Sequence, residues 1–201
     1  MSLTSWIWRK LGHAATDESP GKQLLAGLDF LLLDIEVTGT DATQDTVIGL
    51  ASLPLVDGVF HPGDLHYVNF ADADAVDVSA GYQACLERMT QSVVVTINPN
   101  FIRHMLTLAA DQHQLPPPVG NWLDLSAAAS VIGGEANAAT SLRQWQARMR
   151  SGGRHEHDAI YDVFAMAQLL QALLAYAEDS GIETLADLRR NQSAESWLRP
   201  Y

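Results

Sequence analysis

A row of large apolar residues that ends in two carboxylates, FLLLDIEVTG at 30–39, limits the folds available to this chain more than any other segment. The run is β-branched toward its end and lies between glycines, which is typical of a buried strand. Side chains alternate along a strand, so Asp34 and Glu36 point to the same face, where two like charges repel each other. A Mg²⁺ or Mn²⁺ ion would relieve that repulsion, because both cations prefer oxygen ligands. Solvation of both acids at the end of the strand is the alternative.

The segments that follow predict an α/β fold with a mixed sheet flanked by helices. Strands over 29–37, 46–56 and 65–70 would form an antiparallel meander, with Asp57–Gly58 as a hairpin turn. The pattern then alternates, and we expect a helix over 79–91, a strand over 93–97, a helix from Asn98 to about His113, a strand over 121–125, and helices over 141–150, 156–178 and 182–190. Asn98 is a favourable N-cap, and Pro99 is a favourable first helical residue.

Length and composition fit one ordinary globular domain with short appendages. The chain has 201 residues, of which 47% are hydrophobic and 18% are charged. We assign 1–24 as an N-terminal extension, 25–180 as the main domain and 181–201 as a C-terminal helical tail. No apolar run approaches the ~20 residues of a membrane helix, and the N-terminus lacks the features of a secretory signal. The single cysteine, Cys85, excludes an internal disulfide, so we expect a cytoplasmic protein. Because no long apolar run was found, we also expect no membrane attachment.

The formal charge of −12 argues against tight non-specific binding to a nucleic-acid backbone, which needs a cationic surface. It does not exclude a small acidic metal site that works on a phosphate end. Four arginines gather within twelve positions, at Arg143, Arg148, Arg150 and Arg154. A solvated helix face is the simplest explanation of this group, and a phosphate contact by Arg154 is the alternative.

A second group of polar residues, RHEHDAIYDVFA at 154–165, opens the longest predicted helix. If Glu156 begins that helix, His157 lies in its first turn, and Asp162 follows about one and a half turns later. The histidine and the aspartate would then border one cleft. The alternative is an ordinary helix N-terminus with favourable acids at Glu156 and Asp158 and an incidental histidine.

Together the two segments resemble the DEDDh 3′–5′ exonuclease family, which includes proofreading subunits of bacterial replicative polymerases. The resemblance lies in D-x-E-x-T-G, here DIEVTG at 34–39, and in H-x-A-x-x-D, here HDAIYD at 157–162. It extends to the second strand and hairpin at 45–58, to NWLDLSAAAS at 121–130 and to SLRQWQARM at 141–149, and so covers roughly residues 25–175. The resemblance implies a ribonuclease H-like fold.

The resemblance also implies a metal-dependent reaction that releases mononucleotides from the 3′ end of a nucleic acid. By position, Asp34, Glu36 and Asp162 would ligate a first Mg²⁺ or Mn²⁺, and Asp34 would bridge to a second. His157 would act as the general base toward the attacking water, a task that suits imidazole, whose ordinary pKa is about 6.5. In such sites two cations about 3.5–4 Å apart stabilise the attacking and leaving oxygens.

Substrate contacts would come, by the same resemblance, from Thr38, Asn98 and Phe101. Arg154 lies three residues before His157, and from that position it could contact a backbone phosphate. The partner would be a nucleic-acid 3′ end or a nucleotide. A protein partner or a homodimer is also open.

The chain departs from the family pattern at one acid, which the family carries in H-N-x-x-F-D-x-x-F-L. The corresponding stretch is INPNFIRHML at 97–106, with Ile102 in the place of the acid. Isoleucine cannot ligate a metal, so the second cation would be held poorly. Asn100 and His104 lie about 200° around the helix from Ile102 and do not replace the acid.

Three functions therefore stay open at this stage. The first is a 3′–5′ exonuclease with weakened activity, which the surviving acids and His157 favour. The second is an inactive module that binds a nucleotide or a nucleic-acid end, which Ile102 and the net charge favour. The third is an interaction protein that uses Trp6, Trp8 or residues 182–201, and it leaves the acids unexplained.

Overall fold

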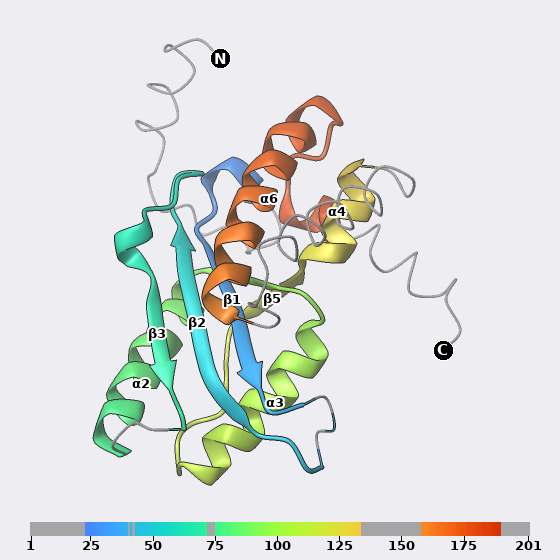
Figure 1. The fold of residues 1–201 in the computed structure, drawn as a ribbon. Helices are drawn as coiled ribbons and strands as arrows, with labels where there is room; N and C mark the ends of the chain where they lie inside the picture. Colours follow the sequence, from blue (N-terminus) through green and yellow to red (C-terminus); the bar gives the residue numbers. More distant parts are fainter. Residues whose placement is uncertain (1–22, 40, 42, 72–74, 134–157, 190–201) are drawn as a thin grey trace.

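A mixed five-stranded sheet forms the centre of the protein (Figure 1). The computed structural model describes residues 23–39, 41, 43–71, 75–133 and 158–189. The strands are β1 (Phe30–Val37), β2 (Val47–Leu55), β3 (His66–Asn69), β4 (Val93–Thr96) and β5 (Asn121–Asp124), in the order β3-β2-β1-β4-β5. β1 pairs antiparallel with β2 and parallel with β4; β2–β3 is antiparallel and β4–β5 parallel. The predicted meander and mixed sheet are confirmed.

Helices cover both faces of this sheet (Figure 1). The helices are α2 (Ala75–Gln91), α3 (Pro99–Gln112), α4 (Leu125–Gly133) and α6 (Ala159–Asp179), with short 3-10 turns at η1 (Leu25–Gly27) and η2 (Pro62–Asp64). α4 and α6 pack on one face, and α2 and α3 pack on the other. The alternation of side chains along β1 thus divides the core into two layers.

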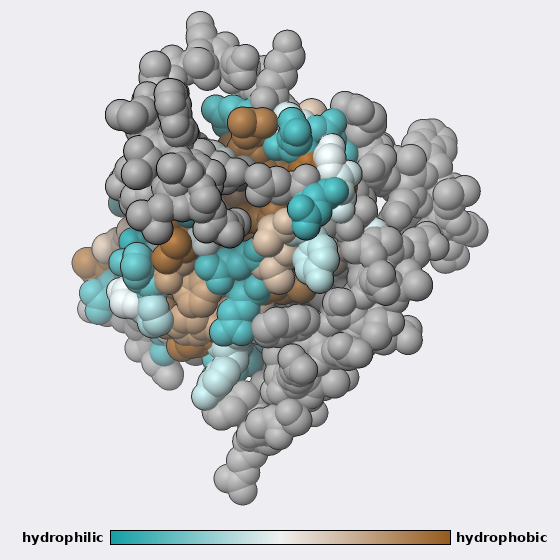
Figure 2. All heavy atoms as spheres, turned by 90° about the horizontal axis from the view of Figure 1, so that it is seen from above, coloured by the Kyte–Doolittle hydropathy of each residue, from teal (hydrophilic) through white to brown (hydrophobic). Residues whose placement is uncertain are grey.

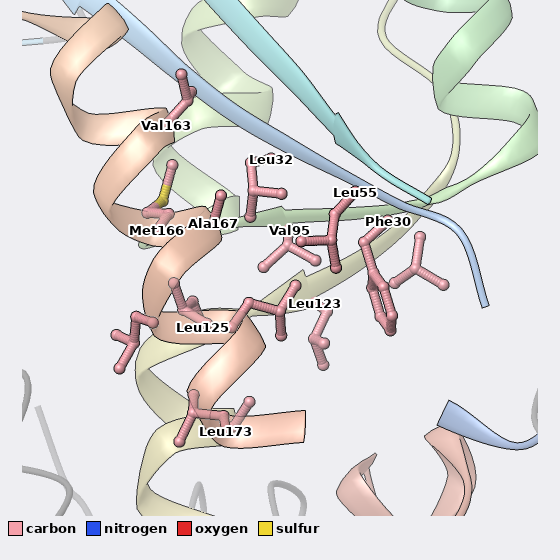
Figure 3. Packing of buried hydrophobic residues seen from close by; sticks show 14 of the residues in the cluster. Phe30, Leu32, Leu55, Val95, Leu123, Leu125, Val163, Met166, Ala167 and Leu173 are labelled. Carbon is pink, nitrogen blue, oxygen red and sulfur yellow. The ribbon is translucent and has the colours of Figure 1, made fainter. Parts of the chain in front are cut away.

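The layer under α6, which we call the α6-side cluster, contains the largest group of buried apolar residues. Figure 3 shows it, with Phe30, Leu32, Leu55, Val95 and Leu123 from the sheet facing Leu125 of α4 and Val163, Met166, Ala167 and Leu173 of α6. By length and mean hydropathy alone, 1.4 over Ala159–Ala177, α6 would suffice to cross a membrane. The sequence-based expectation that no apolar run approaches this length is therefore corrected for this segment. Val163, Met166, Leu170 and Leu173 of the segment pack on the sheet, and 39% of the segment is buried.

The opposite layer, the α3-side cluster, joins β1 to the first two long helices. It is formed by Leu31, Leu33 and Ile35 of β1, Leu50 of β2, Val94 of β4, Tyr82 and Cys85 of α2, and Ile102, Met105 and Leu106 of α3. Odd-numbered residues of β1 therefore face α3, whereas even-numbered residues face α6.

Two local predictions from turn chemistry are confirmed. Asp57 and Gly58 both have positive φ, 51° and 73°, as a two-residue hairpin turn of the favoured hand requires. Gln171 of α6 donates to the carbonyl of Gly58 at 2.7 Å, which fastens the hairpin to the helix. At the start of α3, Asn98 adopts φ 56°, and its side chain accepts from the N–H of Phe101 at 3.4 Å.

The start of the last long helix differs from the prediction. α6 begins at Ala159 with Asp158 as its N-cap, so the expected first residue, Glu156, is three positions too early. α2 begins at Ala75, four residues before the predicted start. The predicted helix over 141–150 lies outside the described residues. Residues 185–189 are helical, and Leu185 and Leu188 are buried in the α6-side cluster.

The glycine before β5 supports one prediction about stability. Gly120 has φ +111°, and a Cβ there would lie 2.7 Å from the carbonyl oxygen of Met89. We expect Gly120→Ala to lower the free energy of unfolding by about 1–3 kcal/mol, measured by urea denaturation, because the backbone strain and the clash add. Gly63→Ala is the matched control, since a Cβ at Gly63 meets nothing within 4 Å. Equal stability of the two variants would contradict the prediction.

Candidate active site

Two aspartates from distant parts of the chain meet on the α6 face of the sheet. Asp34 lies on β1 opposite Ala51 of β2, and Asp162 lies in the first turn of α6. Burial raises the pKa of Asp34 well above its ordinary value, and the charge of Asp162 and a hydrogen bond between the two side chains raise it further. Two carboxylates this close need either a shared proton or a cation between them. The structure therefore brings together two of the three predicted ligands.

Glu36, the third predicted ligand, has a partner that the sequence did not reveal. The Tyr67 hydroxyl of β3 donates to Glu36 Oε2 at 2.8 Å. Gly49 of β2 lies opposite Glu36 in the register, and a Cβ there would lie 2.2 Å from the Tyr67 oxygen and 2.9 Å from Glu36 Oε2. The contact thus exists because the strand between the two residues has no side chain at that point.

The Tyr67 phenol is held in its protonated form. Burial first, and then the hydrogen bond and charge of Glu36, raise the pKa of Tyr67 to about 12. At neutral pH Tyr67 is therefore a hydrogen-bond donor. The charge of Asp158 contributes a smaller part of the same shift, so the N-terminus of α6 lies near this phenol.

Asp158 fixes the start of the helix that carries Asp162. Its Oδ1 accepts from the N–H groups of Ile160 at 3.0 Å and of Tyr161 at 3.4 Å. A carboxylate at an N-cap satisfies backbone donors and interacts favourably with the helix dipole. This cap sets which residues occupy the first turn, and so places Asp162 against β1.

The hydroxyl of Thr38 closes the loop after β1. Thr38 Oγ1 donates to Asp45 Oδ1 at 2.9 Å and accepts from the N–H of Thr46 at 3.0 Å. A Cβ at Gly39 would lie 2.5–2.8 Å from the same Asp45 carboxylate. Thr38 and Gly39 thus both contribute to the conformation of the loop after β1. A substrate contact by Thr38 stays a prediction.

The segment that lacks the family's acid is anchored to the end of β5. The backbone N–H of Asn98 donates to the side chain of Asp124, whose pKa burial raises. Phe101 is half-buried against the α3-side cluster. Ile102 is 4% exposed and belongs to that cluster together with Leu33 of β1. Ile102 therefore packs with the layer under α3, while Asp34 belongs to the face under α6.

The remaining predicted residues are not placed. His157 and Arg154 lie outside the described residues. Among the residues that the structure does describe, no three His, Cys, Asp or Glu side chains are arranged as a metal-binding group. The Asp34–Asp162 pair nevertheless fits Mg²⁺ or Mn²⁺ by donor chemistry, because its donors are all carboxylate oxygens and its like charges lie close together. Glu36 is two residues farther along the same face of β1.

Comparisons with known proteins give a fold and no family assignment. No protein-family model matches the chain, and no curated protein matches its sequence. Exonuclease I of E. coli, in a crystal structure with a dT13 oligonucleotide, is 14% identical with a TM-score of 0.51, over 76% of this chain and 42% of that chain. Exonuclease I from Methylocaldum szegediense is 13% identical with a TM-score of 0.51, over 76% and 40% of the two chains.

A third similar structure is the zinc-bound form of the E. coli exonuclease I complex with single-stranded DNA. It is 14% identical with a TM-score of 0.50, over 72% of this chain and 40% of that one. The present chain therefore covers less than half of the exonuclease I chains that it resembles. At these identities the likeness concerns architecture, and it agrees with the sheet order and the helices on both faces. The protein has the ribonuclease H-like fold that exonuclease I also has.

Proposed function

We propose that this protein is a metal-dependent 3′–5′ exonuclease that releases mononucleotides from nucleic-acid ends with weakened activity. The observation that carries the proposal is the contact of Asp34 with Asp162, at the end of a D-x-E strand in an exonuclease-like fold. A structural role alone gives no reason to hold two like charges, both partly buried, against each other. A site for a divalent cation gives one, because the cation removes the repulsion.

Asp34, Glu36 and Asp162 would hold Mg²⁺ or Mn²⁺ on the α6 face of the sheet. A bound divalent cation would supply electrostatic stabilisation of the phosphate oxygens during hydrolysis. His157, one residue before the cap of α6, is proposed as the general base that accepts the proton of the attacking water. Arg154 is proposed to contact a backbone phosphate, and Thr38, Asn98 and Phe101 are proposed to line the position of the terminal nucleotide.

Ile102 is the reason to propose weakened activity. Its side chain is buried in hydrocarbon, so it contributes no oxygen to a second cation. A site with one well-held cation stabilises the leaving oxygen less than a site with two. An inactive module that binds a nucleotide is therefore the other outcome of the test below.

We expect the wild type to shorten a 5′-labelled single-stranded oligonucleotide stepwise in Mg²⁺ or Mn²⁺, and Asp34→Asn to slow release by at least about 100-fold. The measurement is gel analysis of products over time in each metal separately. Asp111→Asn is the matched control, because Asp111 is an exposed carboxylate on α3. No product from a folded wild type in either metal would overturn the proposal. Metal-dependent nucleotide binding in the same sample would identify an inactive module.

A further inference from the structure

The hydrogen bond between Tyr67 and Glu36 crosses a whole strand. Tyr67 is paired with Ala51 in the register, whereas Glu36 is paired with Gly49, so the phenol reaches diagonally over β2. Its hydroxyl ends 2.8 Å from Glu36 Oε2. Aromatic side chains are long enough to reach diagonal neighbours in a sheet, and here the phenol passes over the intervening strand β2.

Gly49 supplies that small position. Any β-carbon at residue 49 would overlap the Tyr67 oxygen, at 2.2 Å, and would crowd Glu36 Oε2 at 2.9 Å. Glycine in the middle of a strand weakens the strand and often marks a close approach of another group. Here the approaching group is the phenol, and the acceptor is a proposed metal ligand.

We propose that Tyr67 is a positioning residue that fixes the carboxylate of Glu36 for binding a divalent cation. This inference rests on the proposed function, because it assigns a task within the same metal site. The hydrogen bond occupies Oε2, and Oε1 takes no part in it. Ligating carboxylates are commonly held by a second hydrogen bond of this kind, which orients them before the metal arrives.

Without the phenol, Glu36 would lie half-exposed at the end of β1 with several rotatable bonds and no fixed direction. Binding a cation would then require the side chain to be ordered at the moment of binding. With the phenol in place, that ordering has already occurred during folding. Tyr67 therefore acts on the affinity for the cation, and it contacts the cation only through Glu36.

The test measures binding of Mn²⁺ to the full chain without nucleic acid, by electron paramagnetic resonance of free Mn²⁺. We expect Tyr67→Phe to raise the Kd about 10–100-fold, because it removes the hydroxyl and keeps the ring. We expect Gly49→Ala to raise the Kd as well, because the methyl group prevents the approach. The Kd of the double variant is expected to be no higher than that of the single variant with the higher Kd, because both substitutions remove the same contact. Tyr176→Phe, at an exposed tyrosine of α6, is the control.

Each result separates this inference from the proposed function. If the wild type binds no Mn²⁺, the proposed metal site fails and the inference fails with it. If the wild type binds Mn²⁺, Asp34→Asn abolishes binding and Tyr67→Phe stays within about twofold of the wild type, the metal site stands and the role of Tyr67 is refuted. Tighter binding by Tyr67→Phe also refutes it, because Tyr67 would then hold Glu36 away from the cation. Tyr67→Phe alone decides the matter if Gly49→Ala does not fold.

Discussion

In metal-free buffer at pH 8, Asp34→Asn is expected to unfold at a higher temperature than the wild type. Burial and the neighbouring charge of Asp162 raise the pKa of Asp34, which means that the folded state is strained when Asp34 is ionised. Asparagine keeps the shape and the hydrogen bonding and removes the charge. Each unit by which the pKa of Asp34 in the folded state exceeds its pKa in the unfolded state corresponds to about 1.4 kcal/mol of the free energy of unfolding.

The gain in stability from Asp34→Asn is expected to depend on pH in one direction. Unfolded Asp34 ionises near pH ~3.9, whereas folded Asp34 keeps its proton to a higher pH. The wild type therefore loses stability as the pH rises from the unfolded pKa to the raised folded pKa, and the loss is complete above it. The difference in Tm between the variant and the wild type should be small near pH 4 and largest at pH 8.

Adding Mn²⁺ should give the wild type a higher Tm than Asp34→Asn, which reverses the order expected in metal-free buffer. A ligand at 100 times its Kd stabilises the state that binds it by about 2.7 kcal/mol. The wild type gains this stabilisation, and Asp34→Asn, which lacks one ligand, gains little. The measurement is thermal unfolding at several pH values with chelator and with Mn²⁺, with Asp111→Asn as control. If Asp34→Asn had a lower Tm than the wild type in chelator at pH 8, the claim that ionised Asp34 destabilises the folded state would be wrong.

Ile102→Asp is expected to lower the free energy of unfolding by at least about 3 kcal/mol, even though it restores the acid of the family pattern. Ile102 is almost fully buried between α3 and the sheet, among apolar residues that include Leu33 and Met105. A carboxylate there would lose its hydration without a described cationic partner in that cluster. The substitution would also remove the apolar contacts of isoleucine.

Urea denaturation with two controls tests this expectation. Ile102→Val should cost only about 0.5–1.5 kcal/mol, and His104→Asp, on the exposed side of α3, should stay within about 0.5 kcal/mol of the wild type. If Ile102→Asp were as stable as His104→Asp, residue 102 would have access to water or to a cation. A single substitution would then be enough to restore the acid of the family pattern in a stable protein. The packing around Ile102 predicts instead that neighbouring core residues must change as well.

Local patterns predicted the elements well, because they depend on neighbouring residues. The apolar run of 30–37, the Asp57–Gly58 turn and the Asn98–Pro99 helix start each carry their own signal, and all three are confirmed. The start of α6 was misplaced because Glu156 and Asp158 are both acceptable near a helix N-terminus. Only the hydrogen bonds of Asp158 to Ile160 and Tyr161 show which residue is the cap.

The contact of Tyr67 with Glu36 could not be predicted from the sequence, because it depends on the register in which the strands pair. The two residues are 31 positions apart, and a register shift of one residue would turn Tyr67 to the other face. One signal was available: Gly49 interrupts a strand otherwise rich in apolar residues, which marks a close approach. The pairing of Asp34 with Asp162 was predictable only through the family resemblance.

The α6-side cluster also bears on how the chain is made. Leu53 and Leu55 emerge from the ribosome about 100 residues before α6, the helix that covers them. At translation rates of about 5–20 residues per second, their face of the sheet stays uncovered for roughly 5–20 s. The fastening of the Gly58 hairpin by Gln171 must wait for the same helix. Until α6 has been synthesised, Leu53 and Leu55 therefore lack the helix that buries them in the folded protein, and this layer of the core forms only after that helix is made.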